Sequence, residues 1–129
     1  MNNVLVTGSN GQLGSQIRVV AKKFQDYNFL FTDYSELDIT NYDSVKQIIN
    51  SNNINILINC AAYTNVENAE LEPYIANSVN HLAVKNLAKL AKEKRIKLIH
   101  ISTDYVFDGL NKVPYKELDR TNPINQYGI

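Results

Sequence analysis

Three glycines stand at regular intervals near the start of the chain, where an apolar run gives way to a helical pattern. Gly8, Gly11 and Gly14 have the spacing G-x-x-G-x-x-G and follow the apolar residues 4–6. Glycine lets the backbone turn sharply and approach a pyrophosphate, and a helix that begins there offers free N–H groups to it. Asp33 comes about twenty residues further on, the distance typical of the acid in such motifs. The pattern predicts a dinucleotide-binding turn rather than an ordinary glycine-rich turn.

Asp33 also bears on which dinucleotide is bound. A carboxylate at the end of the second strand accepts hydrogen bonds from the ribose hydroxyls of NAD and repels the 2′-phosphate of NADP. Residues 34–37 contain no Arg or Lys to receive that phosphate. The predicted cofactor is therefore NADH or NADPH, with NADH favoured by Asp33. The alternative is a turn aspartate, because Asp-Tyr-Ser is a turn-like sequence.

Small and polar residues follow two later apolar runs. Residues 59–64, Asn-Cys-Ala-Ala-Tyr-Thr, come after the run 54–58, and small side chains there let a cofactor lie against the backbone. Thr103 follows the run 97–102 and offers a hydroxyl to a carbonyl or alkoxide oxygen of a substrate. The phenol of Tyr127 can act as a general acid toward a ketone oxygen, and a nearby cation normally tunes its ordinary pKa of about 10.

The elements that must position these residues alternate between two apolar periods. Short β-branched runs predict strands, and apolar residues three or four apart predict helices with one apolar face, such as Leu13, Ile17, Val20, Ala21 and Phe24. Strands are expected at 4–6, 29–31, 54–58 and 97–102, and helices after the glycines, after a capping box at 40–43, and from about 73 to 94. This alternation predicts an α/β fold: a Rossmann-type parallel sheet with helices on both faces.

The predicted sheet has fewer strands than a doubly wound dinucleotide fold usually has. Four strands are expected within residues 1–129, whereas six are usual. We therefore interpret residues 1–129 as an incomplete NAD(P)-binding Rossmann domain, truncated before the later strands and a C-terminal substrate-binding part.

Composition excludes several other classes of protein. The 129 residues are 44% hydrophobic, and 13 basic residues balance 13 acidic ones, so no broad field attracts nucleic acid or an anionic membrane. No apolar run approaches the ~20 residues needed to span a bilayer, and the N-terminus lacks the pattern of a secretory signal. The single Cys60 excludes an internal disulfide and a multi-cysteine zinc site. We expect a cytoplasmic protein without a metal site.

Taken together, these motifs resemble the extended short-chain dehydrogenases/reductases and, more narrowly, the dTDP-4-dehydrorhamnose reductase family. Four stretches carry the resemblance: VLVTGSNGQLGSQ at 4–16, ELDIT at 36–40, INCAAYTNVENAE at 58–70, and ISTDYVFDG at 101–109 with the later PYKELD and PINQYG. The glycine motif is shared by a whole superfamily. STDYVFDG followed by PYKE is much more specific to this family.

The resemblance implies a role for each matching residue. The glycine turn would meet the cofactor diphosphate, Asp33 the adenosine ribose, and the next loop the adenine, although that loop also suits a helix cap. The residues that it assigns to the cofactor are Gly8, Gly11, Gln12, Leu13, Gly14, Asp33, Asp38, Ile39, Ala62, Tyr63, Thr64 and Tyr127. Thr103 and Asp104 would face a dTDP-sugar, with Thr103 as the catalytic hydroxyl. Tyr127 would be the catalytic tyrosine of a Y-x-x-x-K pair whose lysine falls at position 131.

The implied reaction is hydride transfer to the 4-keto group of dTDP-4-dehydro-L-rhamnose, giving dTDP-L-rhamnose. Tyr127 would protonate the developing alkoxide while Thr103 bonds the same oxygen. Residues 1–129 alone are expected to bind dinucleotide without catalysing the reaction. Two alternatives stay open: another sugar-nucleotide epimerase or reductase of the superfamily, and a non-catalytic regulatory subunit on the same scaffold. A homodimer is a further possibility.

Overall fold

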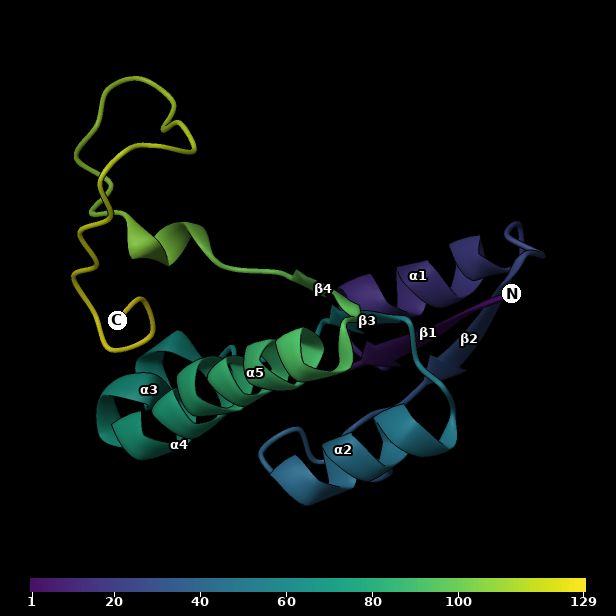
Figure 1. Cartoon of the computed structure of the whole chain (residues 1–129). Coiled ribbons are helices and arrows are strands. Elements are labelled where there is room, and N and C mark those ends of the chain that lie inside the picture. Colours follow the sequence, from purple (N-terminus) through teal and green to yellow (C-terminus); the bar gives the residue numbers. More distant parts are fainter.

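The computed structural model describes residues 1–129 and contains one four-stranded parallel sheet (Figure 1). Its strands are β1 (Asn2–Thr7), β2 (Tyr27–Phe31), β3 (Ile56–Asn59) and β4 (Lys97–His100), in the order β2-β1-β3-β4. All three strand pairs are parallel. The carboxyl ends of the strands therefore meet at one edge of the sheet, and the chain reverses its winding direction between β1 and β3.

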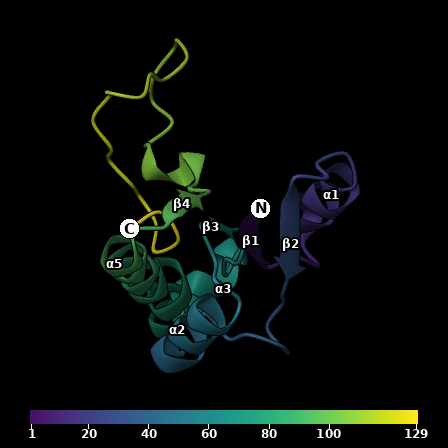
Figure 2. The same cartoon turned by 45° about the vertical axis from the view of Figure 1, so that its right-hand side comes forward.

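Helices cover both faces of this sheet, as predicted. The helix α1 (Gln12–Ala21) lies on one face, and α2 (Tyr42–Ser51) and α5 (Val84–Lys94) lie on the other (Figure 2). Two short helices, α3 (Val66–Leu71) and α4 (Pro73–Asn77), and a π-helical turn, η1 (Ser78–Ala83), lead into α5. The sequence predicts the single helical run from Pro73 to Lys94, but not the preceding α3 or the π turn within the run.

The hydrophobic core lies between the sheet and the pair α2 and α5. Leu5 of β1 and Leu57 of β3 are fully buried there against Val45 of α2 and against Leu87 and Leu90 of α5. Burying a leucine contributes about 1.5–3 kcal/mol, so this layer supplies much of the stability of the fold. The strands β1 and β3 are central, which explains why their sequences are continuously apolar rather than alternating.

The apolar spacing predicts the helix α1 but not how far its apolar side is covered. Leu13 and Val20 are 43% and 46% exposed, because α1 packs beside β2 and has no neighbouring helix (Figure 2). The cap of α2 is Asn41, whose side chain accepts a hydrogen bond from the Ser44 N–H at 3.0 Å. The predicted capping box begins one residue earlier, at Thr40, and this prediction is wrong. The Thr40 hydroxyl donates instead to Asp38 Oδ1.

The tail beyond β4 is irregular, as predicted, apart from the 3-10 turn η2 (Asp104–Val106). It leaves the sheet, forms a loop, and returns to the neighbourhood of α3 (Figure 1). There the Gln126 N–H donates a hydrogen bond of 2.8 Å to Glu70 Oε1 of α3. None of the helices is long and apolar enough to cross a membrane.

Candidate functional site

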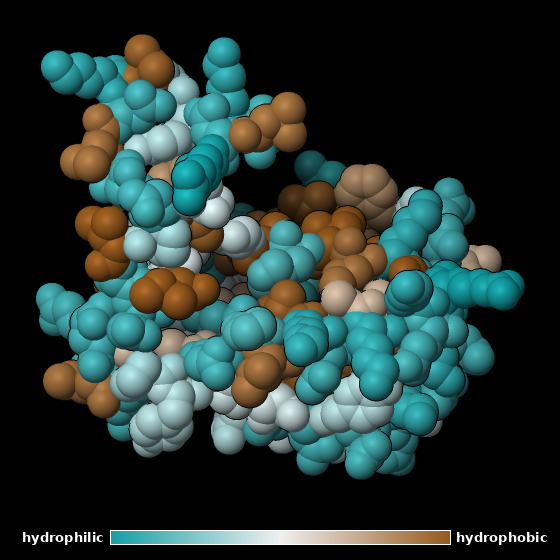
Figure 3. Space-filling model, turned by 60° about the vertical axis from the view of Figure 1, so that its left-hand side comes forward, coloured by the Kyte–Doolittle hydropathy of each residue, from teal (hydrophilic) through white to brown (hydrophobic).

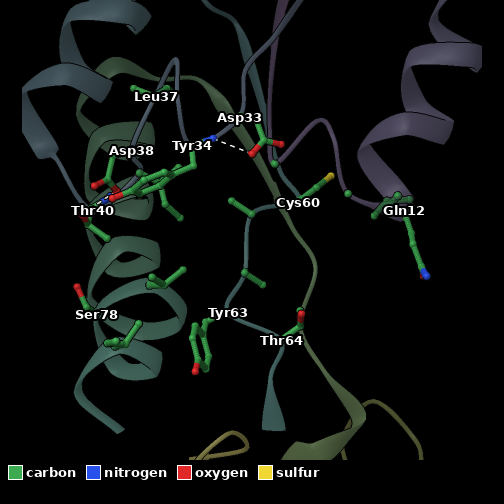
Figure 4. A pocket seen from close by; sticks show the side chains of 18 of the residues that line it. Gln12, Asp33, Tyr34, Leu37, Asp38, Thr40, Cys60, Tyr63, Thr64 and Ser78 are labelled. Carbon is green, nitrogen blue, oxygen red and sulfur yellow. Dashed lines mark hydrogen bonds between the residues drawn. The ribbon is translucent and has the colours of Figure 1, made fainter. Parts of the chain in front are cut away.

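A cavity of about 1020 Å³ opens at the carboxyl ends of β1, β2 and β3. This volume lies at the upper end of the range of ~300–1,000 Å³ for ligand pockets. Ten of the predicted cofactor residues line the cavity (Figure 4): Gly8, Gly11, Gln12, Leu13, Asp33, Asp38, Ile39, Ala62, Tyr63 and Thr64. The structure thus brings together residues from three loops that are far apart in the sequence.

The glycine turn that follows β1 depends on two close backbone approaches. Gly8 has a φ of +63°, and a Cβ there would lie 2.5 Å from the backbone N of Ala61. Gly14 is buried in the first turn of α1, where a Cβ would lie 2.5 Å from Ser9 Cα. Gly14 does not line the cavity, so its contribution is the close packing of α1 on the turn. Gly11 precedes α1 with an ordinary φ of −70°.

The first two glycines of the turn provide a matched pair of substitutions. Gly8→Ala is expected to lower the free energy of unfolding by about 1–3 kcal/mol, since it combines overpacking with a left-handed φ. Gly11→Ala is expected to cost about 1 kcal/mol or less, because a Cβ there meets only Gly8 O at 3.4 Å and the main loss is that of a glycine at the N-cap of α1. Urea unfolding of both variants measures the difference. Equal losses would contradict the close approach of Gly8 to Ala61.

Asp33 joins the end of β2 to the glycine turn. Its Oδ2 accepts a hydrogen bond of 2.8 Å from the Asn10 N–H, and its Oδ1 accepts one of 2.8 Å from the Tyr34 N–H. An ionised carboxylate has about four acceptor positions, so both oxygens can still accept a ribose hydroxyl. The two sequence-based interpretations of Asp33, a turn residue and a ribose acceptor, are therefore compatible in this geometry.

The loop after Asp33 forms an apolar end of the cavity with one free carboxylate oxygen. Leu37 and Ile39 are 4% and 5% exposed and line the cavity wall. Asp38 Oδ1 accepts hydrogen bonds from both the N–H and the hydroxyl of Thr40, at 2.9 and 2.7 Å. Asp38 Oδ2 has no donor within the protein. Tyr34, which is 76% exposed, borders the same end (Figure 4).

The loop after β3 is held by a side chain that the sequence analysis missed. Asn80 lies in the π turn η1, and its Oδ1 accepts from the Tyr63 N–H while its Nδ2 donates to the Tyr63 carbonyl, both at 2.8 Å. This double hydrogen bond fixes the backbone beside Ala62 and Thr64. An asparagine inside an otherwise good helix-forming sequence is a weak signal of such a role, because it has a poor helix propensity. Single-turn π segments are frequent at functional sites.

A polar ladder joins β1, β3 and β4 at their carboxyl ends. Thr7 Oγ1 donates to Asn59 Oδ1 at 2.6 Å, and Asn59 Nδ2 lies 3.0 Å from His100 Nδ1. With this amide orientation His100 Nδ1 is the acceptor. Desolvation lowers the pKa of His100, which favours the neutral imidazole. The ladder joins β1, β3 and β4 side by side.

Cys60 borders the cavity, but its surroundings do not activate the thiol. The side chain is half-buried, and burial raises the pKa of the thiol. Since the thiolate is the nucleophile, a raised pKa is unfavourable for nucleophilic catalysis. No group of three or more His, Cys, Asp or Glu side chains is placed to hold a metal ion.

The predicted catalytic residues lie in the tail rather than in the large cavity. Thr103 caps η2, where its Oγ1 accepts a hydrogen bond of 3.2 Å from the Tyr105 N–H. The ring of Tyr127 packs edge-on against the ring of Tyr105, with centroids 5.3 Å apart. Asp104 borders a separate cavity of about 290 Å³. The structure therefore brings Tyr127 to the segment that carries Thr103, but leaves both outside the lining of the large cavity.

The sheet order and the glycine turn define the class of protein. A parallel sheet that reverses its winding beside a glycine-rich strand-to-helix turn, with an acid after the next strand, is a Rossmann-type dinucleotide-binding domain. Within that class, the family model described as the RmlD substrate binding domain matches residues 1–129, and the chain belongs to this family. The predicted fold class and the resemblance to the reductase family are thus confirmed.

Relatives of known identity support the same assignment. The dTDP-4-dehydrorhamnose reductase of Aggregatibacter actinomycetemcomitans is 46% identical over 128 residues, 99% of this chain and 44% of that protein. The dTDP-4-keto-6-deoxy-D-glucose reductase of Streptomyces niveus is 37% identical over 124 residues, 96% of this chain and 43% of that protein. A crystal structure of dTDP-4-dehydrorhamnose reductase from Bacillus anthracis in complex with NADP superimposes with a TM-score of 0.94. It is 39% identical, covering 99% of this chain and 46% of that one. The chain thus spans less than half the length of these relatives.

Proposed function

We propose that this chain is the dinucleotide-binding part of a reductase that converts dTDP-4-dehydro-L-rhamnose to dTDP-L-rhamnose with NADH or NADPH. The observation that carries the proposal is the cavity at the strand ends, which unites the glycine turn, Asp33 and the loop after β3. The membership of the RmlD family and the reductase names of the relatives point to the same chemistry.

The residues around the cavity fit a nicotinamide dinucleotide. The turn at Gly8 brings backbone against backbone, leaving no room for a Cβ, and the free N–H groups at the start of α1 suit a diphosphate. Asp33 retains acceptor positions for ribose hydroxyls, and Asp38 Oδ2 is free to accept the amino group of adenine beside the apolar Ile39. The loop at 62–64 would support the remainder of the cofactor.

The chemistry requires a hydride and a proton. When bound, the reduced nicotinamide supplies the hydride that converts the 4-keto carbon of the sugar to a secondary alcohol. In our proposal the phenol of Tyr127 gives its proton to the former carbonyl oxygen. Thr103 donates a hydrogen bond to the same oxygen, and Asp104 binds the sugar nucleotide. The resemblance places a lysine at position 131, where it would hold the nicotinamide ribose and lower the pKa of the tyrosine.

An assay of the longer reductase that contains residues 1–129 tests this function. With NADH or NADPH and dTDP-4-dehydro-L-rhamnose, we expect one cofactor to be oxidised for each dTDP-L-rhamnose formed. Chromatography measures both products. An epimerase would instead retain its cofactor through turnover and release NAD on denaturation, without net oxidation. A protein that binds cofactor but turns over no dTDP-4-keto sugar would support the regulatory-subunit alternative and contradict the proposal.

The cofactor preference is a separate prediction that depends on Asp33. We expect the reductase to prefer NADH to NADPH, because the Asp33 carboxylate repels a 2′-phosphate. Arg18 reaches the glycine turn, but its guanidinium already donates to Ser9 Oγ at 2.9 Å and stacks over the Phe31 ring. Asp33→Ala should narrow the preference, as measured by kcat/KM with each cofactor. The substitution should also weaken the binding of both cofactors somewhat, since the Asn10 N–H in the glycine turn loses its acceptor.

The opposite result is informative too. A clear NADPH preference of the unmodified reductase would show that Asp33 serves the turn alone.

Cytoplasmic location and a homodimer stay predictions from the sequence. Gel filtration of the reductase at several concentrations measures the second of these directly.

A further inference from the structure

The tail between Val106 and Asn122 forms a closed loop that has no part in the cofactor cavity. The Asn122 N–H donates a hydrogen bond of 2.9 Å to the Val106 carbonyl, so the two ends of the loop lie side by side. Within the loop the rings of Phe107 and Tyr115 stack with centroids 4.2 Å apart and an interplanar angle of 8°. These residues belong to the Phe-Asp-Gly and Pro-Tyr-Lys-Glu motifs of the sequence. We call residues 107–122 the tail loop.

Asp108 is the polar centre of the tail loop. Its Oδ1 accepts hydrogen bonds from the Tyr115 hydroxyl at 2.7 Å and the Leu110 N–H at 3.0 Å. Its Oδ2 accepts one of 3.0 Å from Asn122 Nδ2, at the far end of the loop. These donors hold the pKa of the Asp108 carboxyl at about 2, so the group is ionised at neutral pH. One carboxylate thus joins the beginning, middle and end of the loop.

The closed loop returns the chain to the segment from which it departed. Beyond Asn122, the Tyr127 ring meets the Tyr105 ring edge-on, and the buried Gly128 lies against the Tyr105 carbonyl, where a Cβ would overlap. Tyr105 in turn donates its backbone N–H to Thr103 Oγ1. The chain that leaves this segment at Val106 thus returns to it after Asn122, and this return brings the Tyr127 ring beside Tyr105.

We propose that Asp108 is a positioning residue for Tyr127, which it holds beside the Thr103 segment by closing the tail loop. Asp108 touches neither of these residues and acts through Asn122 and Tyr115. The proposal rests on the proposed function of Tyr127 as proton donor. A second tether, from the Gln126 N–H to Glu70, reaches the same stretch from α3. Without the closed loop, this tether alone does not hold Tyr127 beside Tyr105.

Three variants separate loop closure from other effects. Asp108→Ala removes all three acceptors. Asp108→Asn keeps an oxygen for Tyr115 and Leu110, and its amide can pair with a flipped Asn122 side chain, so it should rescue the loop. Asp119→Ala is the matched control, because Asp119 lies in the same loop but accepts only the local Lys116 N–H, at 2.8 Å.

The direct readout is the contact between the two tyrosine rings, measured as nuclear Overhauser effects in the 129-residue chain with labelled tyrosine. The Tyr105–Tyr127 effects should be present in the unmodified chain, Asp108→Asn and Asp119→Ala, and lost in Asp108→Ala. Circular dichroism checks that the sheet and helices are intact, as expected for a change far from the core. Unchanged ring contacts in Asp108→Ala would overturn the proposal, because Glu70 would then suffice.

Kinetics of the longer reductase distinguish this proposal from the proposed function. If both hold, Asp108→Ala should lower kcat about tenfold to a hundredfold, the loss expected for a misplaced catalytic group, without changing the KM for NADH. Asp108→Asn should restore most of the rate. If Asp108→Ala loses the ring contact while kcat is unchanged, the proposal that Asp108 positions Tyr127 still holds. The proposed role of Tyr127 as proton donor would then be contradicted.

Discussion

Tyr127→Phe is expected to lower kcat of the longer reductase by about 10²–10⁴-fold, the usual contribution of a positioned general acid. The substitution removes the hydroxyl that donates the proton but keeps the ring that packs on Tyr105. The fold of the tail and the affinity for dinucleotide should therefore change little. Single-turnover oxidation of NADH with dTDP-4-dehydro-L-rhamnose measures the chemical step.

Tyr27→Phe is the matched control, since Tyr27 lies on β2 and its hydroxyl makes no hydrogen bond within the protein. That variant should react at the unmodified rate. A Tyr127→Phe enzyme with nearly normal turnover would show that another group protonates the alkoxide. The assignment of the Y-x-x-x-K tyrosine to this position would then be wrong.

Thr103→Val is expected to lower kcat by about 10²-fold or more, the typical cost of losing one hydrogen bond to a developing oxyanion. Valine keeps the shape of the side chain and deletes its hydroxyl. The same hydroxyl caps η2 by accepting the Tyr105 N–H, so Thr103→Ser, which retains both hydrogen bonds, is the control. Steady-state kinetics at saturating NADH compare the three proteins.

The two roles of Thr103 have different signatures. Loss of the hydrogen bond to the substrate lowers kcat and leaves NADH binding unchanged, because Thr103 does not line the cofactor cavity. A variant that binds NADH much more weakly and turns over normally once saturated would contradict the assignment to the sugar side. Serine failing to restore the rate would indicate that the methyl group, and not the hydroxyl, matters.

Local sequence patterns were sufficient to predict the four strands and the loops that line the cavity. The strand β1 is buried on both faces, and β3 is buried on one face and half-buried on the other, so their apolar runs stand out clearly from the polar loops that follow. The glycine turn can be predicted because other parts of the backbone lie so close to Gly8 and Gly14 that a Cβ at either position would overlap them. Parallel strand order then brings Asp33 and the loop after β3 to the same edge.

Features that depend on distant partners could not be predicted in this way. The helical spacing of Leu13 and Val20 indicates an apolar face, but not whether another helix covers it, and both residues are exposed. Asn80 acts through the Tyr63 backbone, and Tyr127 reaches Tyr105 through a loop closed by Asp108. Each of these contacts joins residues separated by a long stretch of chain, and neither propensity nor periodicity contains that information.

The central claim is that residues 1–129 form a nicotinamide dinucleotide site, and calorimetric titration of NADH into this chain tests it most directly. We predict saturable binding, weak but measurable, that is diminished in Gly8→Ala. The same chain should show no detectable reduction of dTDP-4-dehydro-L-rhamnose. A chain that is folded by circular dichroism yet gives no binding heat with NADH or NADPH, and no shift in its thermal unfolding with either, would contradict the claim.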